Sequence, residues 1–150
     1  LMAHYDLTLR WLKPERTAFF AQSFFNLKTM IILSLLFTTV GTISGGIWAD
    51  QSWGRFWGWD PKENGALLIV LWLSWLLHGR ISGHINQVGF IAGSALLSIV
   101  VVLAWFGVNL LNVGLHSYGF ISGVATGIAI FCVLEMILVG FLWRMGKKRA

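Results

Sequence analysis

The sequence predicts an all-α integral membrane protein with about four transmembrane helices and two short outer loops. The chain of 150 residues is 57% hydrophobic and only 11% charged, with a mean hydropathy of +0.74. Soluble domains carry about 25% charged residues. Residues 30–49 and residues 81–134 contain no Lys, Arg, Asp or Glu. Because about 20 apolar residues cross a bilayer core of about 30 Å, the second window holds more than one helix.

The elements follow from the positions of these apolar windows. Residues 1–28 are predicted as a cytoplasmic or interfacial segment, in which residues 17–28 form an amphipathic stretch that leads into the membrane. A four-helix membrane domain is expected over residues 29–143, with a tryptophan loop at 48–63, an outer loop at 112–118 and a basic cytoplasmic tail at 144–150. Its helices are expected over residues 29–49, 63–80, 87–111 and 119–143.

The start of the second helix carries a capping signature. Asp60, Pro61 and Glu63 occupy the N-cap, first and third helical positions. An acidic N-cap, a proline in the first turn and a glutamate three residues after the cap are typical of a helix start. Asp60 and Glu63 are therefore interpreted as capping residues rather than ligand contacts.

The distribution of basic residues predicts the orientation in the membrane. Nine of the eleven Lys and Arg residues fall in residues 1–28, 79–87 and 144–150, which four spans place on one side. The opposite side carries only Arg55 and Lys62. This bias places both termini in the cytoplasm and the tryptophan loop outside. The net charge of +5 then indicates contact with anionic lipid rather than with nucleic acid.

Four tryptophans stand within twelve positions of the tryptophan loop: Trp48, Trp53, Trp57 and Trp59. One or two such residues would be explained as interfacial anchors. Four of them, interleaved with Gly54 and Gly58, exceed that need. An aromatic surface with a cation at its edge suits a large planar ligand with anionic groups, such as haem. Arg55 is the expected partner of the haem propionates, whereas for Lys62 that role and a solvated loop charge are equally supported.

The four histidines differ in their expected surroundings, and a histidine near a span is a site hypothesis by default. His116 lies in an outer turn and could be an axial iron ligand. His78 lies at the inner end of the second helix, where a site role and a headgroup-level histidine are evenly balanced. His84 is expected to be solvated, and His4 receives no role. Glu135 is expected near the inner interface, as a plain carboxylate or loosely paired with His78 or Lys147.

Four motifs, in the right order, resemble the CcsA (ResC) branch of haem-handling proteins in system II cytochrome c biogenesis. The resemblance covers about residues 35–120. In chain order, the motifs are Gly45-Gly46-Ile47-Trp48-Ala49; the WWD motif Trp53-Gly54-x-x-Trp57-x-Trp59-Asp60-Pro61-Lys62-Glu63; Leu77-His78-x-Arg80; and Gly107-Val108-Asn109-Leu110-Leu111 through Gly114-Leu115-His116-Ser117-Tyr118-Gly119.

The resemblance implies a function. Proteins of this family, together with a CcsB (Ccs1) partner or fused domain, carry haem b across the membrane and present it on the outer face. There it is attached to the Cys-x-x-Cys-His motif of an apocytochrome c. The resemblance implies that the tryptophan loop is the haem platform, that His116 is an outer axial ligand and that His78 holds haem within the membrane. Whether this part of a holocytochrome c synthase complex is itself an enzyme stays open.

One feature of the family has no counterpart in this sequence. The family has a second outer histidine on a helix before the WWD loop, and His4 is expected on the opposite side of the membrane. We therefore expect the chain to be the C-terminal part of a longer CcsA or fused CcsBA protein, carrying one ligand of each haem pair.

Two other functions fit the residues less well. A membrane b-type haem electron-transfer subunit would need facing histidines inside the bundle, and only His78 comes near it. A scaffold in which the aromatic residues only anchor would leave the clustering of Gly, Trp and His on one face unexplained.

Overall fold

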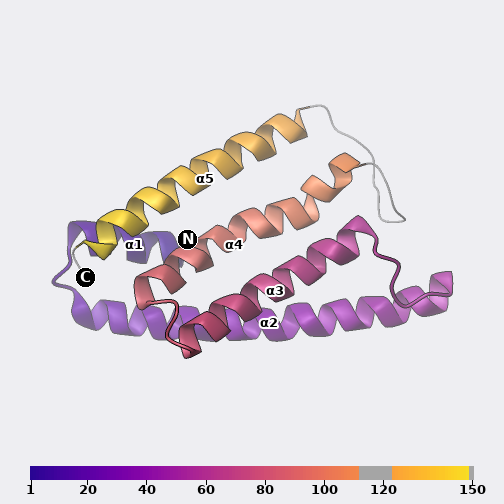
Figure 1. Cartoon of the computed structure of the whole chain (residues 1–150), viewed down its shortest axis with the longest axis horizontal. Coiled ribbons are helices and arrows are strands. Elements are labelled where there is room, and N and C mark those ends of the chain that lie inside the picture. The colour runs from indigo at the N-terminus through magenta and orange to yellow at the C-terminus, as the bar shows by residue number, and fades with distance from the viewer. Residues whose placement is uncertain (112–122, 149–150) are drawn as a thin grey trace.

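The structure is a computed structural model in which residues 1–111 and 123–148 are described (Figure 1). The described residues form helices without strands, and four of the helices are long and apolar enough to cross a membrane. The prediction of an all-α membrane protein with four spans is confirmed. In chain order the elements are α1 (Met2–Leu12), α2 (Thr17–Trp53), α3 (Pro61–Ile81), α4 (Gln87–Trp105), the 3-10 helix η1 (Gly107–Leu111) and α5 (Val124–Lys147).

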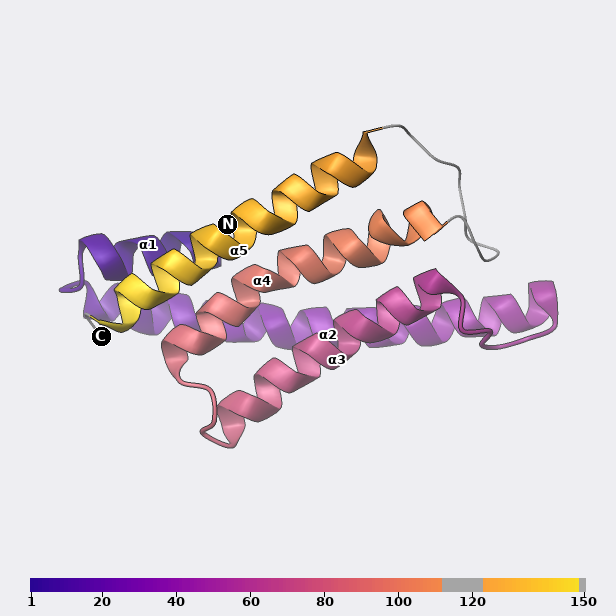
Figure 2. The same ribbon diagram turned by 45° about the horizontal axis from the view of Figure 1, so that its top comes forward.

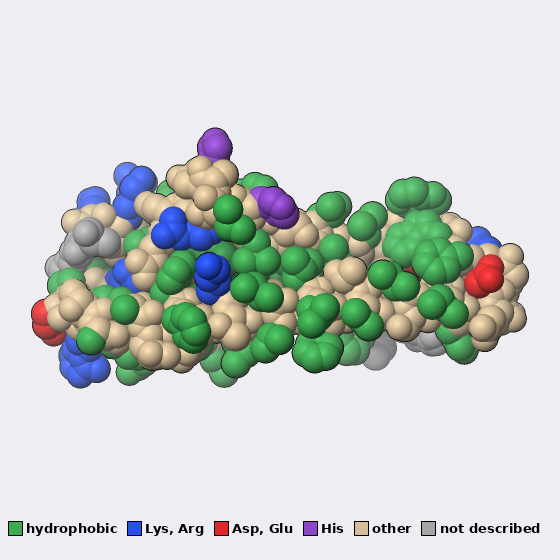
Figure 3. Space-filling view, turned by 90° about the horizontal axis from the view of Figure 1, so that it is seen from below, with side chains coloured by type: hydrophobic (Ala, Val, Ile, Leu, Met, Phe, Trp, Pro, Cys, Tyr) green, Lys and Arg blue, Asp and Glu red, His purple; other side chains and the backbone are tan. Residues whose placement is uncertain are grey.

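The four long helices lie side by side in the order α2, α3, α4, α5, and each reverses the direction of the one before (Figures 1 and 2). Helix α4 is the centre, because 44% of its span is buried against 11–17% for the other three. We call the end with the α2–α3 connection (residues 54–60) the loop end. The opposite end, with the α3–α4 connection (residues 82–86), is the basic end, where lysine and arginine side chains gather (Figure 3).

The first long helix extends beyond its predicted bounds of 29–49 at both ends. Residues 17–28 contain neither glycine nor proline, so the interfacial stretch continues into the span as one helix of 37 residues. The helix ends where Gly54 adopts a left-handed φ of 70° and its N–H donates to the Asp50 carbonyl. Trp48 and Trp53 therefore lie on the last turns of α2, not in a loop.

The remaining helices lie close to their predicted positions. Helix α3 is longer than the predicted 63–80 by a few residues, and α4 with η1 covers the predicted 87–111. Helix α5 runs over 124–147 instead of 119–143, so Arg144 and Lys147 of the predicted tail belong to its last turn. Residues 119–122 lie outside the described part of the chain.

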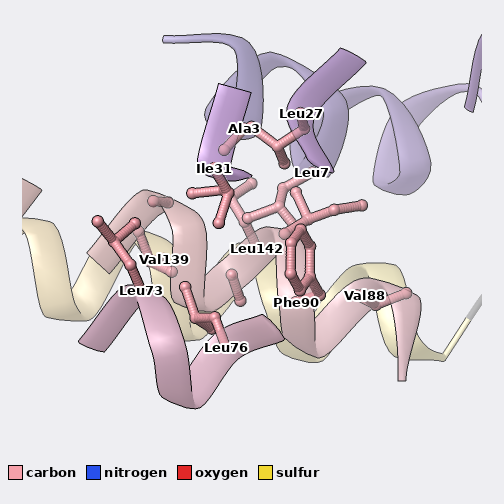
Figure 4. Close-up of a cluster of buried hydrophobic side chains, with 13 residues drawn as sticks. Ala3, Leu7, Leu27, Ile31, Leu73, Leu76, Val88, Phe90, Val139 and Leu142 are labelled. Atoms are coloured by element: carbon pink, nitrogen blue, oxygen red, sulfur yellow. The ribbon is translucent and has the colours of Figure 1, made fainter. Parts of the chain in front are cut away.

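The predicted N-terminal segment contains a helix that the sequence analysis did not identify. Helix α1 packs against α2, α4 and α5, and its Leu7 is fully buried. The apolar core around it draws side chains from all five α-helices, with Phe90 of α4 at its centre (Figure 4). The core thus sits toward the basic end.

Helix α1 also brings a polar cluster into the bundle, and here two predictions were wrong. His4 Nε2 lies 2.8 Å from a carboxylate oxygen of Glu135, and the Ser98 hydroxyl donates to the same oxygen at 2.8 Å. Glu135 is buried at the middle of α5, and its partners are His4 and Ser98 rather than His78 or Lys147. Polar groups at this depth need such partners because lipid offers none.

The cluster predicts an energetic coupling between His4 and Glu135. In a double-mutant cycle with His4→Ala and Glu135→Ala, unfolding from detergent micelles should show a coupling of about 0.5–1.5 kcal/mol. The same cycle with His84→Ala serves as a control and should be additive, because the His84 ring lies within hydrogen-bond distance of Ser82 and not of Glu135. Additive effects of His4→Ala and Glu135→Ala would contradict this assignment.

Candidate functional site

The four predicted tryptophans lie together at the loop end. Trp48 and Trp53 are on the last turns of α2, and Trp57 and Trp59 are in the connection that leads to α3. Trp48 and Trp53 form one ring pair, with centroids 5.0 Å apart and an interplanar angle of 76°. Trp57 and Trp59 form a second pair at 6.0 Å and 88°. The aromatic surface is therefore not one flat sheet but two edge-to-face pairs, in which a face of one ring meets the edge of the other.

Phe56 joins the two pairs. Its ring lies against the backbone of α2 at Gly46, where an added Cβ would come within 2.8 Å of it. Trp48, Phe56 and Trp57 line a common cavity of ≈ 180 Å³ between α2 and α3. Ligand pockets usually measure about 300–1,000 Å³. A large planar molecule would therefore lie on this surface and not inside it.

The Glu63 carboxylate fixes the backbone of the tryptophan loop. The same carboxylate oxygen accepts the N–H of Gly58 at 2.8 Å and that of Asp60 at 3.1 Å. The Asp60 side chain accepts the N–H of Lys62 and also that of Glu63, and the bond from Glu63 completes the predicted capping box and confirms the helix start. The bond to Gly58 extends the role of Glu63 beyond capping, and no signal in the sequence indicated it.

Between these two anchored amides, Trp59 adopts a backbone conformation that a bulky residue rarely takes. Its φ is 56°, the one positive φ among the non-glycine residues of the described chain. Such strain persists only where the surroundings fix it, and here the side-chain amide of Asn64 also donates to the Trp59 carbonyl. As a result Trp59 is 69% exposed, and at the same end of the bundle Trp48 is 56% exposed.

A cation lies in the same connection as Trp57 and Trp59. Arg55 is exposed, and its guanidinium lies directly against Gly58, at a position that a Cβ there would occupy. Lys62 is half-buried and lines the cavity beside Glu63. The start of α3 is in turn held close to α4, because a Cβ at Gly65 would meet the Ala104 backbone at 2.9 Å.

His78 is separated from this surface by most of α3. It lies about 25 Å along the helix from Pro61, at the basic end, and its side chain is exposed. Its Nδ1 lies 2.8 Å from the Ser74 carbonyl oxygen. A carbonyl only accepts hydrogen bonds, so Nδ1 carries the proton and Nε2 keeps a lone pair that could bind a metal.

Two of the other three histidines lie in the described part of the chain. His116 lies outside the described residues. His84 is exposed in the α3–α4 connection, with Nδ1 2.8 Å from the Ser82 hydroxyl. The three described histidines thus bond to three different partners, and His4 is the one that the sequence analysis had set aside. Only a helical assignment of residues 2–12 could have indicated its partner.

Known proteins resemble this chain over most of its length. A sequence model of the family described as "Cytochrome C assembly protein" matches residues 4–116. "Cytochrome c biogenesis protein CcsA" of Morus indica is 39% identical over 90 residues, covering 60% of this chain and 28% of that protein. The proteins of the same name from Cuscuta reflexa and Oenothera argillicola are 39% and 40% identical over 90 residues, again 60% of this chain and 29% and 28% of theirs.

The chain spans less than a third of the length of these curated relatives. No solved structure matches it. The family match covers all of the tryptophan cluster and both His78 and His116. By its sequence and its membrane-spanning helices, the chain belongs to the cytochrome C assembly protein family.

Proposed function

We propose that the chain handles haem in cytochrome c maturation, holding it as a transported substrate and presenting it outside the membrane to an apocytochrome c. The observation that carries this proposal is the strained, exposed Trp59 beside Arg55, because an ordered aromatic surface at a membrane edge needs a purpose that offsets its backbone cost. Family membership and the relatives named for cytochrome c biogenesis support the same process.

The residues of the loop end fit one edge of a haem. The exposed faces of Trp59 and Trp48 offer apolar contact to the porphyrin, and Arg55 offers a bidentate donor for a propionate. We assign His116 as the axial ligand on this side. Since the surface is open, the protein supplies binding and orientation, while the haem vinyl groups remain accessible to the thiols of the apocytochrome.

We assign His78 to the first stage of the same process, the uptake of haem on the inner side. Its Nδ1 is held by the Ser74 carbonyl, and this contact fixes the tautomer in which the Nε2 lone pair is available to an iron ion. We propose that the basic end faces the cytoplasm and the loop end faces outward. His78 then takes haem on the inner side and His116 on the outer side, and a CcsB-type partner or domain supplies the other ligands.

The role of Glu63 gives a prediction on haem binding. Glu63→Ala leaves two backbone N–H groups without their acceptor, which destabilises the ordered conformation of the loop by about 1–2 kcal/mol. Haem bound by the full-length protein, measured as pyridine haemochrome, should fall about tenfold. Glu63→Gln keeps one acceptor oxygen and should retain most of the haem. The control Asp50→Ala removes an exposed carboxylate at the same end and should have no effect. Equal losses of haem in Asp50→Ala and Glu63→Ala would rule out a specific role for the hydrogen bonds that Glu63 accepts.

The role of His116 predicts a chemical rescue. His116→Gly should abolish holocytochrome c formation in cells, and added imidazole should partly restore it by serving as a surrogate iron ligand. Imidazole should not restore Glu63→Ala, because that defect lies in the loop backbone and not in ligation. Normal maturation by His116→Gly without imidazole would favour a scaffold and refute the proposal.

A further inference from the structure

A second aromatic surface lies at the basic end. Its residues lie outside the four sequence motifs, although on α3 they come shortly before the Leu77-His78 motif. It is an open cavity of ≈ 510 Å³ over α4, between α3 and α5, and we call it the basic-end groove. Trp72 and Trp75 of α3 line one wall and Trp143 of α5 lines the other. Its volume is within the usual range of small-molecule sites.

The groove lies between aromatic walls over small residues of α4. On the α4 side it is lined by Gly89, Ala92 and Gly93, together with Leu96. The indole N–H of Trp72 donates to the Gly93 carbonyl at 3.0 Å, which fixes this ring as a wall. Trp75 lies beside it with a centroid distance of 5.4 Å. Aromatic walls around a narrow apolar slot favour a planar ligand.

The mouth of the groove carries positive charge. The Lys147 ammonium is held 5.6 Å from the centroid of the Trp143 ring, and His84 lines the same mouth. No Asp or Glu of the described chain contributes to the lining. Arginine and lysine side chains surround this end (Figure 3). The groove therefore complements an amphiphile with a planar apolar body and an anionic edge.

His78 follows one wall of the groove along α3. Trp75 stands three residues before His78, so the two side chains are neighbours on the surface of α3. We propose that the basic-end groove is the entry site for haem, where the porphyrin lies between Trp75 and Trp143 with its propionates at Lys147 and His84 before His78 takes the iron. This inference rests on the proposed function and adds the place at which the substrate is first bound.

A variant that fills the groove with a larger side chain tests the assignment of the groove as the entry site. At Gly140, which lines the groove, an added Cβ meets nothing within 4 Å, so Gly140→Leu introduces an apolar side chain at the slot from a position that is open at Cβ. Gly127→Leu is the matched control, because Gly127 also lies on α5 in open space but away from the groove. Both variants of the full-length protein are prepared in inside-out vesicles of zwitterionic lipid, and hemin is added from the medium. Gly140→Leu should slow the appearance of ligated haem about tenfold, and Gly127→Leu should not.

A second pair of variants tests the charge at the mouth. Lys147→Gln should slow hemin uptake about threefold, the effect expected of one exposed ion pair. Lys148→Gln, which removes the adjacent cation without touching the groove, should not slow it. Haem dimethyl ester lacks the carboxylates, so its uptake should be the same in Lys147→Gln and in wild type.

The outcomes separate the groove from the proposed function. If His78→Gly abolishes ligated haem while Gly140→Leu loads as fast as wild type, the groove assignment is wrong and the proposed function stands. If His78→Gly and His116→Gly both mature cytochrome c normally, the proposed function is wrong. A slowing by Gly140→Leu that occurs only in vesicles of anionic lipid would identify a lipid site and overturn the inference.

Discussion

The geometry of the loop end depends on one carboxylate. Glu63 accepts the N–H groups of Gly58 and Asp60, and these two bonds hold the intervening Trp59 in its left-handed conformation. A membrane-spanning helix satisfies its own backbone, but the chain between two helices must find other partners close to the lipid. Here the first turn of α3 provides them. The same residue thus starts a helix and sets the direction in which an exposed indole points.

The bundle separates two aromatic surfaces by the length of α3. The loop end presents tryptophan pairs on a shallow surface with Arg55, and the basic end presents a slot with Lys147. Between them, α4 packs closely on α3, with Gly65 against Ala104 toward the loop end and Trp72 bonded to Gly93 nearer the basic end. A rigid central helix with a different binding surface at each end suits a protein that receives a ligand on one side and delivers it on the other.

The sequence predicted those features that depend on local patterns and missed those that depend on distant contacts. The charge-free windows located the spans, and Asp60-Pro61-x-Glu63 located the start of α3, because hydropathy and capping are local. The 17–53 helix was underestimated because the amphipathic stretch 17–28 was interpreted as an interfacial segment, although nothing in it stops a helix. His4 and Glu135, 131 positions apart, meet only after α1 docks, so a position counted along the last helix could not indicate the partners of Glu135.

The predicted tryptophan cluster gained a specific form in the same way. Spacing alone could place Trp48, Trp53, Trp57 and Trp59 near one another, but not divide them into two edge-to-face pairs bridged by Phe56. The most direct measurement is an experimental structure of the full-length protein loaded with haem. The account predicts a porphyrin against the exposed faces of Trp48 and Trp59, with its iron bound to His116 and a propionate at Arg55. A loaded protein in which the porphyrin lies away from the tryptophan loop, with these rings facing only lipid or water, would contradict it.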